Sequence, residues 1–116
     1  MSLKIIYIDD EPELCENFID TFSEAGISIL TFTDANSAIA AAKKTPPDLI
    51  FLDYRLPGTN GDKVAQLIDP SIPKYLITGD IAVATTYNFQ AVFPKPYDKA
   101  DISKFLHQFT RIKRAS

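Results

Sequence analysis

The sequence predicts an α/β fold in which helices cover both faces of a five-stranded parallel sheet. Three observations support this class. Short apolar runs alternate with amphipathic helical runs along the whole chain. The central run Leu49–Leu52 is continuously apolar, as in a strand buried on both faces. Acids or turn residues follow the runs where strands would end. Right-handed crossovers favour a doubly wound sheet of order 2-1-3-4-5. We expect one domain over residues 1–116.

The first strand and helix have clear boundary signals. The apolar, β-branched run Leu3–Ile8 is a predicted strand, and the acidic run 9–11 ends it. Pro12 favours the first turn of a helix. Apolar side chains then recur at three- and four-residue spacing until Gly26, which is expected to end the helix. Cys15 lies in this helix and is expected to be a small core residue.

The middle of the chain repeats this strand and helix pattern. Ile27–Phe32 is a second predicted strand, and Asp34 is the predicted cap of the alanine-rich helix Ala35–Lys44. Two prolines end that helix. The third predicted strand, Leu49–Leu52, then ends at Asp53, just before a Pro-Gly turn. This strand is expected at the centre of the sheet.

The last part of the chain contains a weaker element. Residues 62–68 are a predicted short helix, and Lys74–Thr78 is the fourth predicted strand. Residues 81–90 have a poor helix composition, so a fourth helix there should be short or irregular. Residues 91–93 are the last predicted strand, and Asp98 is the predicted cap of a final helix. That helix has one apolar stripe: Ile102, Phe105, Leu106, Phe109 and Ile112.

Composition excludes several kinds of partner. The net charge is -3, and a nucleic-acid surface needs a concentrated basic face, so we expect no nucleic-acid partner. No segment is long and apolar enough to span a membrane, and no signal peptide opens the sequence. The one cysteine cannot form an internal disulfide, which suits a reducing compartment. These features predict a cytoplasmic protein.

Polar residues at the strand ends predict a site. The ends carry Asp9 and Asp10, Asp53, Thr78 and Lys95, and the carboxyl ends of parallel strands share one edge of the sheet. Three adjacent carboxylates repel one another, so we expect a hard divalent cation such as Mg²⁺ among them. A hydroxyl and an ammonium group opposite the acids would bind an anion. Together these groups indicate phosphoryl transfer.

In their order, these residues resemble the receiver domain of two-component response regulators, of the single-domain, chemotaxis-regulator type. The resemblance covers essentially the whole chain and its flavodoxin-like strand order. The matching motifs are Asp9-Asp10 after the first strand, Asp53 followed by Leu56-Pro57-Gly58 and Gly61, Thr78-Gly79, and Lys95-Pro96. In this family the Lys-Pro peptide is usually cis, which is the expected form of Lys95-Pro96.

The resemblance implies a role for each matched residue. Asp53 would accept a phosphoryl group from the phosphohistidine of a sensor histidine kinase or a histidine phosphotransfer protein. Thr78 and Lys95 would each bind a phosphoryl oxygen. Mg²⁺ would be held by four groups: Asp10 directly, Asp9 through water, the Asp53 carboxylate and the Arg55 carbonyl oxygen. The protein would catalyse only its own phosphorylation and slow dephosphorylation, and would not otherwise be an enzyme.

Two departures from the family concern the output. Val92 occupies the position where the family commonly has an aromatic residue that swings inward on activation. The segment between Thr78 and Lys95 is also shorter than usual. With no effector domain after the last helix, we expect the output to be a protein contact with a downstream target, or a step in a phosphorelay. A homodimer through the 79–112 face is a further expectation.

Three other functions compete with this interpretation. A pseudo-receiver would use the same fold as a protein-interaction module without phosphorylation, although such modules tend to lose a site residue. A flavodoxin-like cofactor binder would need a glycine- and hydroxyl-rich loop after the first strand, where this chain has acids. An aspartyl-phosphate phosphatase would carry its nucleophile on the first strand and need a cap domain.

Overall fold

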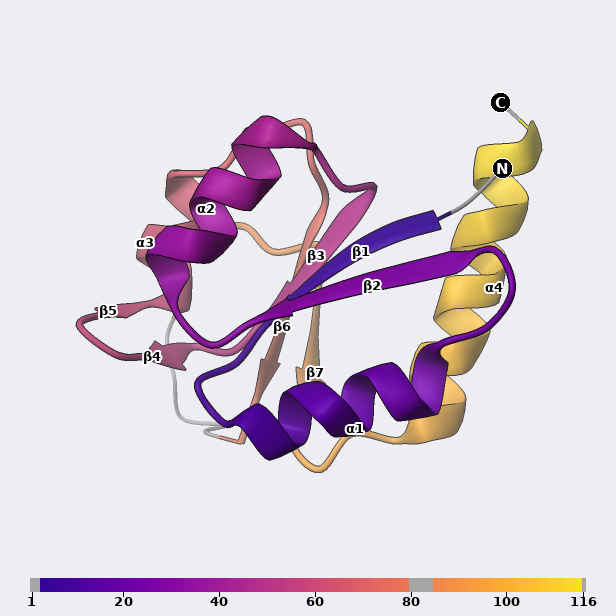
Figure 1. Ribbon diagram of the computed structural model, residues 1–116, viewed down its shortest axis with the longest axis horizontal. Coiled ribbons are helices and arrows are strands. Elements are labelled where there is room, and N and C mark those ends of the chain that lie inside the picture. Colours follow the sequence, from indigo (N-terminus) through magenta and orange to yellow (C-terminus); the bar gives the residue numbers. More distant parts are fainter. Residues whose placement is uncertain (1–2, 80–84, 116) are drawn as a thin grey trace.

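The computed structural model describes residues 3–79 and 85–115, with side chains as far as residue 111. Strands and helices alternate as the sequence predicts (Figure 1). The elements are β1 (Leu3–Ile8), α1 (Pro12–Phe22), β2 (Ile27–Phe32), α2 (Ala35–Lys44), β3 (Leu49–Leu52), β4 (Arg55–Leu56), β5 (Thr59–Asn60), α3 (Gly61–Gln66), β6 (Lys74–Thr78), β7 (Ala91–Pro94) and α4 (Lys99–Ala115).

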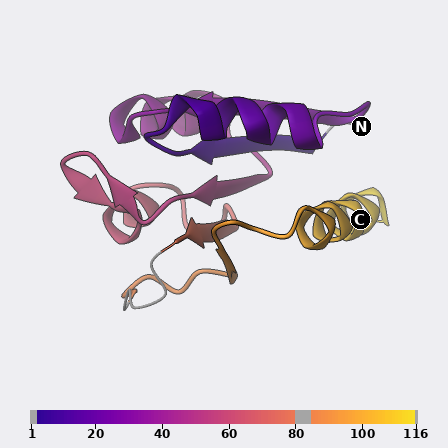
Figure 2. The same ribbon diagram turned by 90° about the horizontal axis from the view of Figure 1, so that it is seen from below.

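The main sheet has the strand order β2-β1-β3-β6-β7, and all its pairs are parallel. This order is the predicted 2-1-3-4-5, because β4 and β5 form a separate antiparallel hairpin. In the second view, β1 lies towards one side of the molecule and β6 towards the other, with β3 between them (Figure 2). The reversal between β1 and β3 is the topological switch point, beside which such sheets bind their ligands.

Two apolar cores lie on the two faces of the sheet. One packs α1 and α4 against the sheet and is rich in rings; its centre is Phe18, which stacks on Tyr7 and contacts Phe51. The other packs α2 and α3 against the opposite face, with Ile8 and Leu52 fully buried. The helices are accordingly paired on opposite sides of the sheet in Figure 1. Burial on both faces explains the continuous apolar run of β3.

One helix boundary needs correction. Helix α1 ends at Phe22, before the expected Gly26, because Ser23 is already extended and its N–H bonds to the Ile19 carbonyl. Gly26 instead has a φ of 88° in the turn that leads into β2. No helix forms over residues 85–90, where the sequence predicts a short or irregular helix at most, and residues 81–84 of that prediction lie outside the described residues. Residues 85–90 form irregular structure, in agreement with their poor helix composition.

The irregular segment 85–90 is fastened to its neighbours by two buried polar side chains. Asp62 on α3 accepts hydrogen bonds from the Thr86 N–H (2.8 Å), the Thr86 hydroxyl (3.2 Å) and the Tyr87 N–H (3.3 Å). Lys74 on β6 donates to the Tyr87 hydroxyl at 3.1 Å. These bonds hold the segment over the apolar core that contains α3, against which Phe89 packs. Side-chain hydrogen bonds therefore take the place of helix packing.

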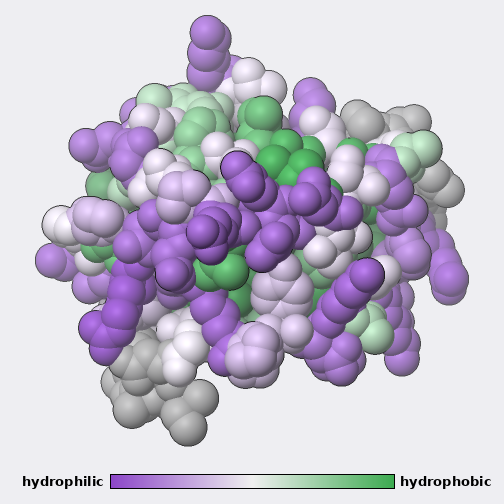
Figure 3. Space-filling model, turned by 60° about the horizontal axis from the view of Figure 1, so that its bottom comes forward, coloured by the Kyte–Doolittle hydropathy of each residue, from purple (hydrophilic) through white to green (hydrophobic). Residues whose placement is uncertain are grey.

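The face of the molecule shown in Figure 3 is mostly hydrophilic. On the face turned forward in Figure 3, hydrophilic side chains separate small apolar areas. Large apolar residues that the structure describes as exposed are Leu30, Leu67 and Val92. Within the described residues, no helix is both long and apolar enough to cross a membrane.

Candidate functional site

The predicted site residues follow neighbouring strands at one edge of the sheet. Asp9 comes directly after β1 and Asp53 directly after β3, and the Asp53 N–H bonds to the Ile8 carbonyl at 3.0 Å. Thr78 ends β6, and Lys95 follows β7 with its N–H on the Thr78 carbonyl at 3.0 Å. The pairing of the strands thus brings residues that are far apart in the chain together at one edge of the sheet.

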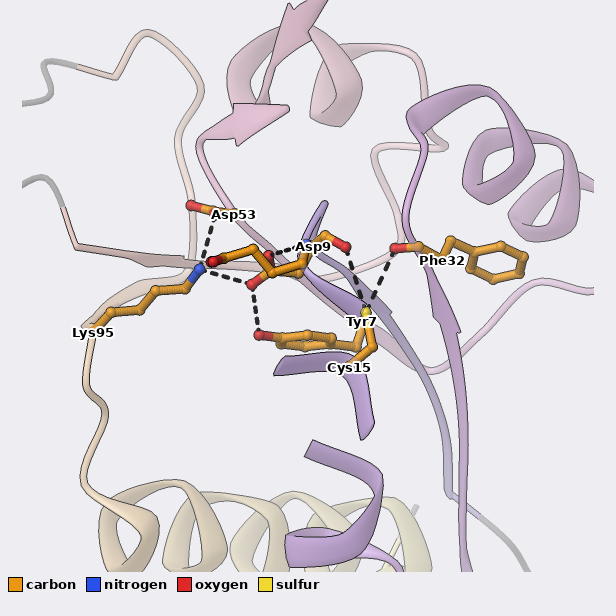
Figure 4. A network of polar contacts seen from close by, with 7 residues as sticks. Tyr7, Asp9, Cys15, Phe32, Asp53 and Lys95 are labelled. Carbon is orange, nitrogen blue, oxygen red and sulfur yellow. Dashed lines mark hydrogen bonds and ion pairs between the residues drawn. The ribbon is translucent and has the colours of Figure 1, made fainter. Parts of the chain in front are cut away.

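Lys95 joins the two buried acids of the site. Its ammonium nitrogen lies 2.7 Å from Asp9 Oδ2 and 2.8 Å from Asp53 Oδ2 (Figure 4). The Lys95-Pro96 peptide is cis, as expected. Burial alone would lower the pKa of Lys95, but its bonds to Asp53 and Asp9 outweigh that effect and the pKa is raised. Lys95 is therefore a fixed positive charge between the acids at neutral pH.

Asp9 and Asp10 are adjacent in the chain but lie in opposite environments. Asp9 is fully buried, whereas Asp10 is exposed. Asp9 Oδ1 accepts from the Glu11 N–H at 3.1 Å, and Oδ2 accepts from the Tyr7 hydroxyl at 3.0 Å as well as from Lys95. Sequence reasoning missed Tyr7. Strand alternation was the available signal, because residues two apart on a strand share one face.

The three acids form a candidate metal site. One carboxylate oxygen from each of Asp9, Asp10 and Asp53 can be chosen so that all lie within 4.8 Å of one another. Hard oxygen ligands of this kind suit Mg²⁺, and one ammonium group leaves the cluster with excess negative charge. The donor set therefore fits the predicted cation. Asp10, being exposed, is the carboxylate most open to a hydrated ion.

The remaining predicted residues line the same region. Thr78 is buried at the end of β6, beside Gly79, where an added Cβ would lie 3.6 Å from the Lys95 Cβ. Arg55 is exposed at the start of β4, two residues after Asp53. Gly61 packs closely against the backbone at Asp53, since a Cβ there would lie 2.9 Å from the Asp53 carbonyl oxygen. A side chain at position 61 would therefore force this backbone to shift.

Burial and nearby charge also raise the pKa values of two groups next to Asp9, the Tyr7 hydroxyl and the Cys15 thiol. Burial raises the pKa of the Tyr7 hydroxyl, and the nearby Asp9 carboxylate raises it further. The pKa of the Cys15 thiol is raised by burial, again with help from Asp9. Cys15 is buried on α1, and its Sγ lies 3.4 Å from the Asp9 carbonyl oxygen. It is therefore a protonated core residue, as the sequence predicts.

Comparison with known proteins gives a family match. Residues 5–107 match the model of the response regulator receiver domain. The probable transcriptional regulatory protein TcrX of Mycobacterium tuberculosis is 37% identical over 82 residues, which is 68% of this chain and 35% of that protein. The DNA-binding response regulator MtrA of Mycolicibacterium smegmatis is 31% identical over 80 residues, 67% of this chain and 35% of that protein. The chain thus spans about a third of these relatives.

Solved structures show the same fold. A signal receiver domain of an HD domain-containing protein from Pseudomonas fluorescens Pf-5 superposes with a TM-score of 0.87 at 19% identity, and each chain is covered completely. The chemotaxis response regulator CheY4 of Vibrio cholerae gives a TM-score of 0.77 at 22% identity, over 93% of this chain and 98% of that one. At these identities the likeness concerns the fold alone.

Proposed function

Because the chain belongs to the response regulator receiver domain family, we propose that Asp53 accepts a phosphoryl group from the phosphohistidine of a partner protein. The observation that carries the proposal is the convergence of Asp9, Asp10 and Asp53, with the Lys95 ammonium group bonded to Asp9 and Asp53. Such a cluster both binds a divalent cation and presents a carboxylate nucleophile beside a fixed positive charge. We further propose that residues 1–116 act as one receiver domain.

In the proposed reaction, an Asp53 carboxylate oxygen attacks the phosphorus atom of the phosphohistidine. A new O–P bond forms while the P–N bond breaks, and its electron pair stays on the imidazole nitrogen of the partner. Lys95 already bonds Asp53 at 2.8 Å, so its ammonium group lies where a phosphoryl oxygen would arrive. The Thr78 hydroxyl would bind a second phosphoryl oxygen. The chain thus contributes position and charge, which carry most of phosphoryl transfer.

The three acids and the Arg55 carbonyl oxygen would hold the metal. When bound, Mg²⁺ would supply positive charge that offsets the negative charge of the acids and of the phosphoryl group. The burial pattern supports different parts for the two adjacent acids. Asp9 already accepts three hydrogen bonds from the protein, whereas Asp10 is exposed. We therefore assign direct ligation to Asp10 and the second, water-mediated part to Asp9.

The family and the relatives suggest which kinds of molecule this protein binds. Receiver domains take phosphate from sensor histidine kinases or histidine phosphotransfer proteins, and we propose the same source here, with a downstream protein as target. The expected absence of a nucleic-acid partner is not supported, because MtrA is named as a DNA-binding response regulator. That expectation holds at most for the receiver residues. The pseudo-receiver alternative is not favoured, since Asp10, Asp53, Thr78 and Lys95 are all present.

The proposal is tested by intact mass after incubation with acetyl phosphate and Mg²⁺. We expect the wild type to gain one phosphoryl group and Asp53→Asn to gain none, because the amide is not a nucleophile. Asp20→Asn is the matched control, since Asp20 is an exposed acid on α1. Phosphate on Asp53→Asn, or none on the wild type, would overturn the assignment.

A second prediction concerns the metal. We expect Asp10→Asn to weaken Mg²⁺ binding by about tenfold or more, since loss of a ligand costs at least as much as loss of its supporting contacts. Isothermal titration calorimetry of metal-free protein measures this directly. Asp20→Asn should bind like the wild type. Equal affinity for wild type and Asp10→Asn would remove Asp10 from the metal site.

A further inference from the structure

Asp9 carries a buried charge that protein groups must satisfy. Its side chain is fully buried, and three donors surround it: the Glu11 N–H, the Tyr7 hydroxyl and the Lys95 ammonium group (Figure 4). Two of these, Tyr7 and Lys95, share the same oxygen, Oδ2. Since an unpaired buried carboxylate is costly, losing one donor strengthens the hold of Asp9 on the other.

Tyr7 is the more rigid of the two donors. It is buried in β1, its ring lies 4.2 Å from that of Phe18 in a stacked pair, and its backbone is in register with β2 and β3. Figure 4 shows its hydroxyl directed at the Asp9 carboxylate from within the core. Lys95, in contrast, comes from the loop after β7 and keeps part of its side chain exposed. Lys95 is therefore the donor that can move.

We propose that Tyr7 is a positioning residue of the phosphoacceptor site, which holds Asp9 so that Lys95 can turn to the phosphoryl group. The inference rests on the proposed function. In the present geometry Lys95 bonds Asp9 and Asp53 together. Once Asp53 carries a phosphoryl group, the ammonium is needed at a phosphoryl oxygen. Tyr7 and Glu11 still satisfy Asp9 when Lys95 shifts, so the buried carboxylate competes less for the ammonium.

Tyr7→Phe tests the inference because it removes only the hydroxyl and keeps the ring on Phe18. Without that donor, Asp9 holds Lys95 more tightly, and we expect phosphorylation by acetyl phosphate to slow about tenfold, the size of one hydrogen bond to a charged group. Tyr75→Phe is the control: Tyr75 is a buried tyrosine near the start of β6, at the other end of the sheet.

The background variant Asp9→Asn separates positioning from packing. A neutral amide does not compete with a phosphoryl group for the ammonium, so Tyr7→Phe should change the rate by less than about twofold in that background. If Tyr7→Phe slows both backgrounds equally, or slows neither, the inference is wrong. A slowing of similar size in Tyr75→Phe would also overturn it.

A second readout needs neither metal nor phosphate. With EDTA present to remove metal, we compare how far Lys95→Met lowers the urea concentration at the unfolding midpoint, once in the wild type and once in the Tyr7→Phe variant. If Tyr7 and Lys95 share the Asp9 carboxylate, the midpoint should fall further in the Tyr7→Phe variant, because Lys95 is then the last side-chain donor to Asp9 Oδ2. Additive losses would overturn the inference. A wild type that gains no phosphate would overturn the proposed function instead, and this cycle would still show whether Tyr7 and Lys95 share Asp9.

Discussion

At the scale of single residues, the site depends on which way each side chain leaves its strand. Residues two apart on β1 share a face, so Tyr7 and Asp9 lie on the same side. Asp10, the next residue, is exposed at the rim. If β1 were shifted by one residue in the sheet, the two acids would exchange environments, so that Asp9 would be exposed and Asp10 buried. The difference in burial between Asp9 and Asp10 therefore follows from strand register.

Arg55 gives the next prediction at this scale. It is exposed two residues after Asp53 and follows the acceptor into β4, where a long cation can cover a phosphoryl group. We expect Arg55→Ala to shorten the dephosphorylation half-life several-fold by admitting water. The measurement is loss of phosphoryl mass with time after donor removal. Arg111→Ala, an exposed arginine on α4, should leave the half-life unchanged; equal half-lives for all three proteins would make Arg55 a solvated loop charge.

At the scale of elements, Asp62 links α3 to the irregular segment 85–90. Asn60 begins α3 by accepting from the Lys63 N–H, which leaves the next buried acid, Asp62, free to face the segment. Gly61, between them, packs on the Asp53 carbonyl. The start of α3 therefore contacts the backbone at Asp53 through Gly61 and the segment 85–90 through the Asp62 side chain.

Removal of this link should loosen the segment. We expect Asp62→Ala to cost about 2 kcal/mol of unfolding free energy, since two backbone N–H groups lose their acceptor. Amide hydrogen exchange at Thr86 and Tyr87 should accelerate, with little change in β1 or β3. Asp101→Ala, at an exposed position in the first turn of α4, is the control. Unchanged protection at Thr86 and Tyr87 would show that the bonds do not hold the segment.

At the scale of the whole molecule, β7 is the edge of the sheet and exposes Val92. Its relative exposure is 56%, whereas Ile102 and Leu106 of α4 are buried against the sheet. These two α4 side chains are thus covered, whereas Val92 on β7 leaves an apolar surface exposed. Val92 has no ring to swing inward, and its exposure shows that its side chain points outward.

This surface is where the expected homodimer should form. We predict that beryllofluoride with Mg²⁺ shifts the protein from monomer to dimer in size-exclusion chromatography with light scattering. Val92→Asp should prevent the shift, because a charge at an apolar contact must be desolvated. Leu67→Asp is the matched control, since Leu67 is also a large exposed apolar residue, at the end of α3. A wild type that stays monomeric with the mimic bound would exclude this mode of output.

Sequence alone determined the elements whose signals are local. Apolar runs ended by acids predicted the sheet and its order, and the strand ends predicted that Asp9, Asp53 and Lys95 lie together. These predictions worked because a strand buried on both faces must be apolar throughout, and because the ends of parallel strands meet at one edge.

Only the tertiary structure decided the contacts between distant parts of the chain. Nothing local to residues 85–90 indicates that Asp62, 24 positions before Thr86, replaces helix packing there. Likewise, the run Leu3–Ile8 predicts only an apolar strand. The proposed role of Tyr7 depends on Lys95, 86 positions after Asp9, which bonds the same Asp9 oxygen, Oδ2. Hydrogen bonds of this kind depend on where separate elements pack, and the helix or strand propensity of a segment does not predict that packing.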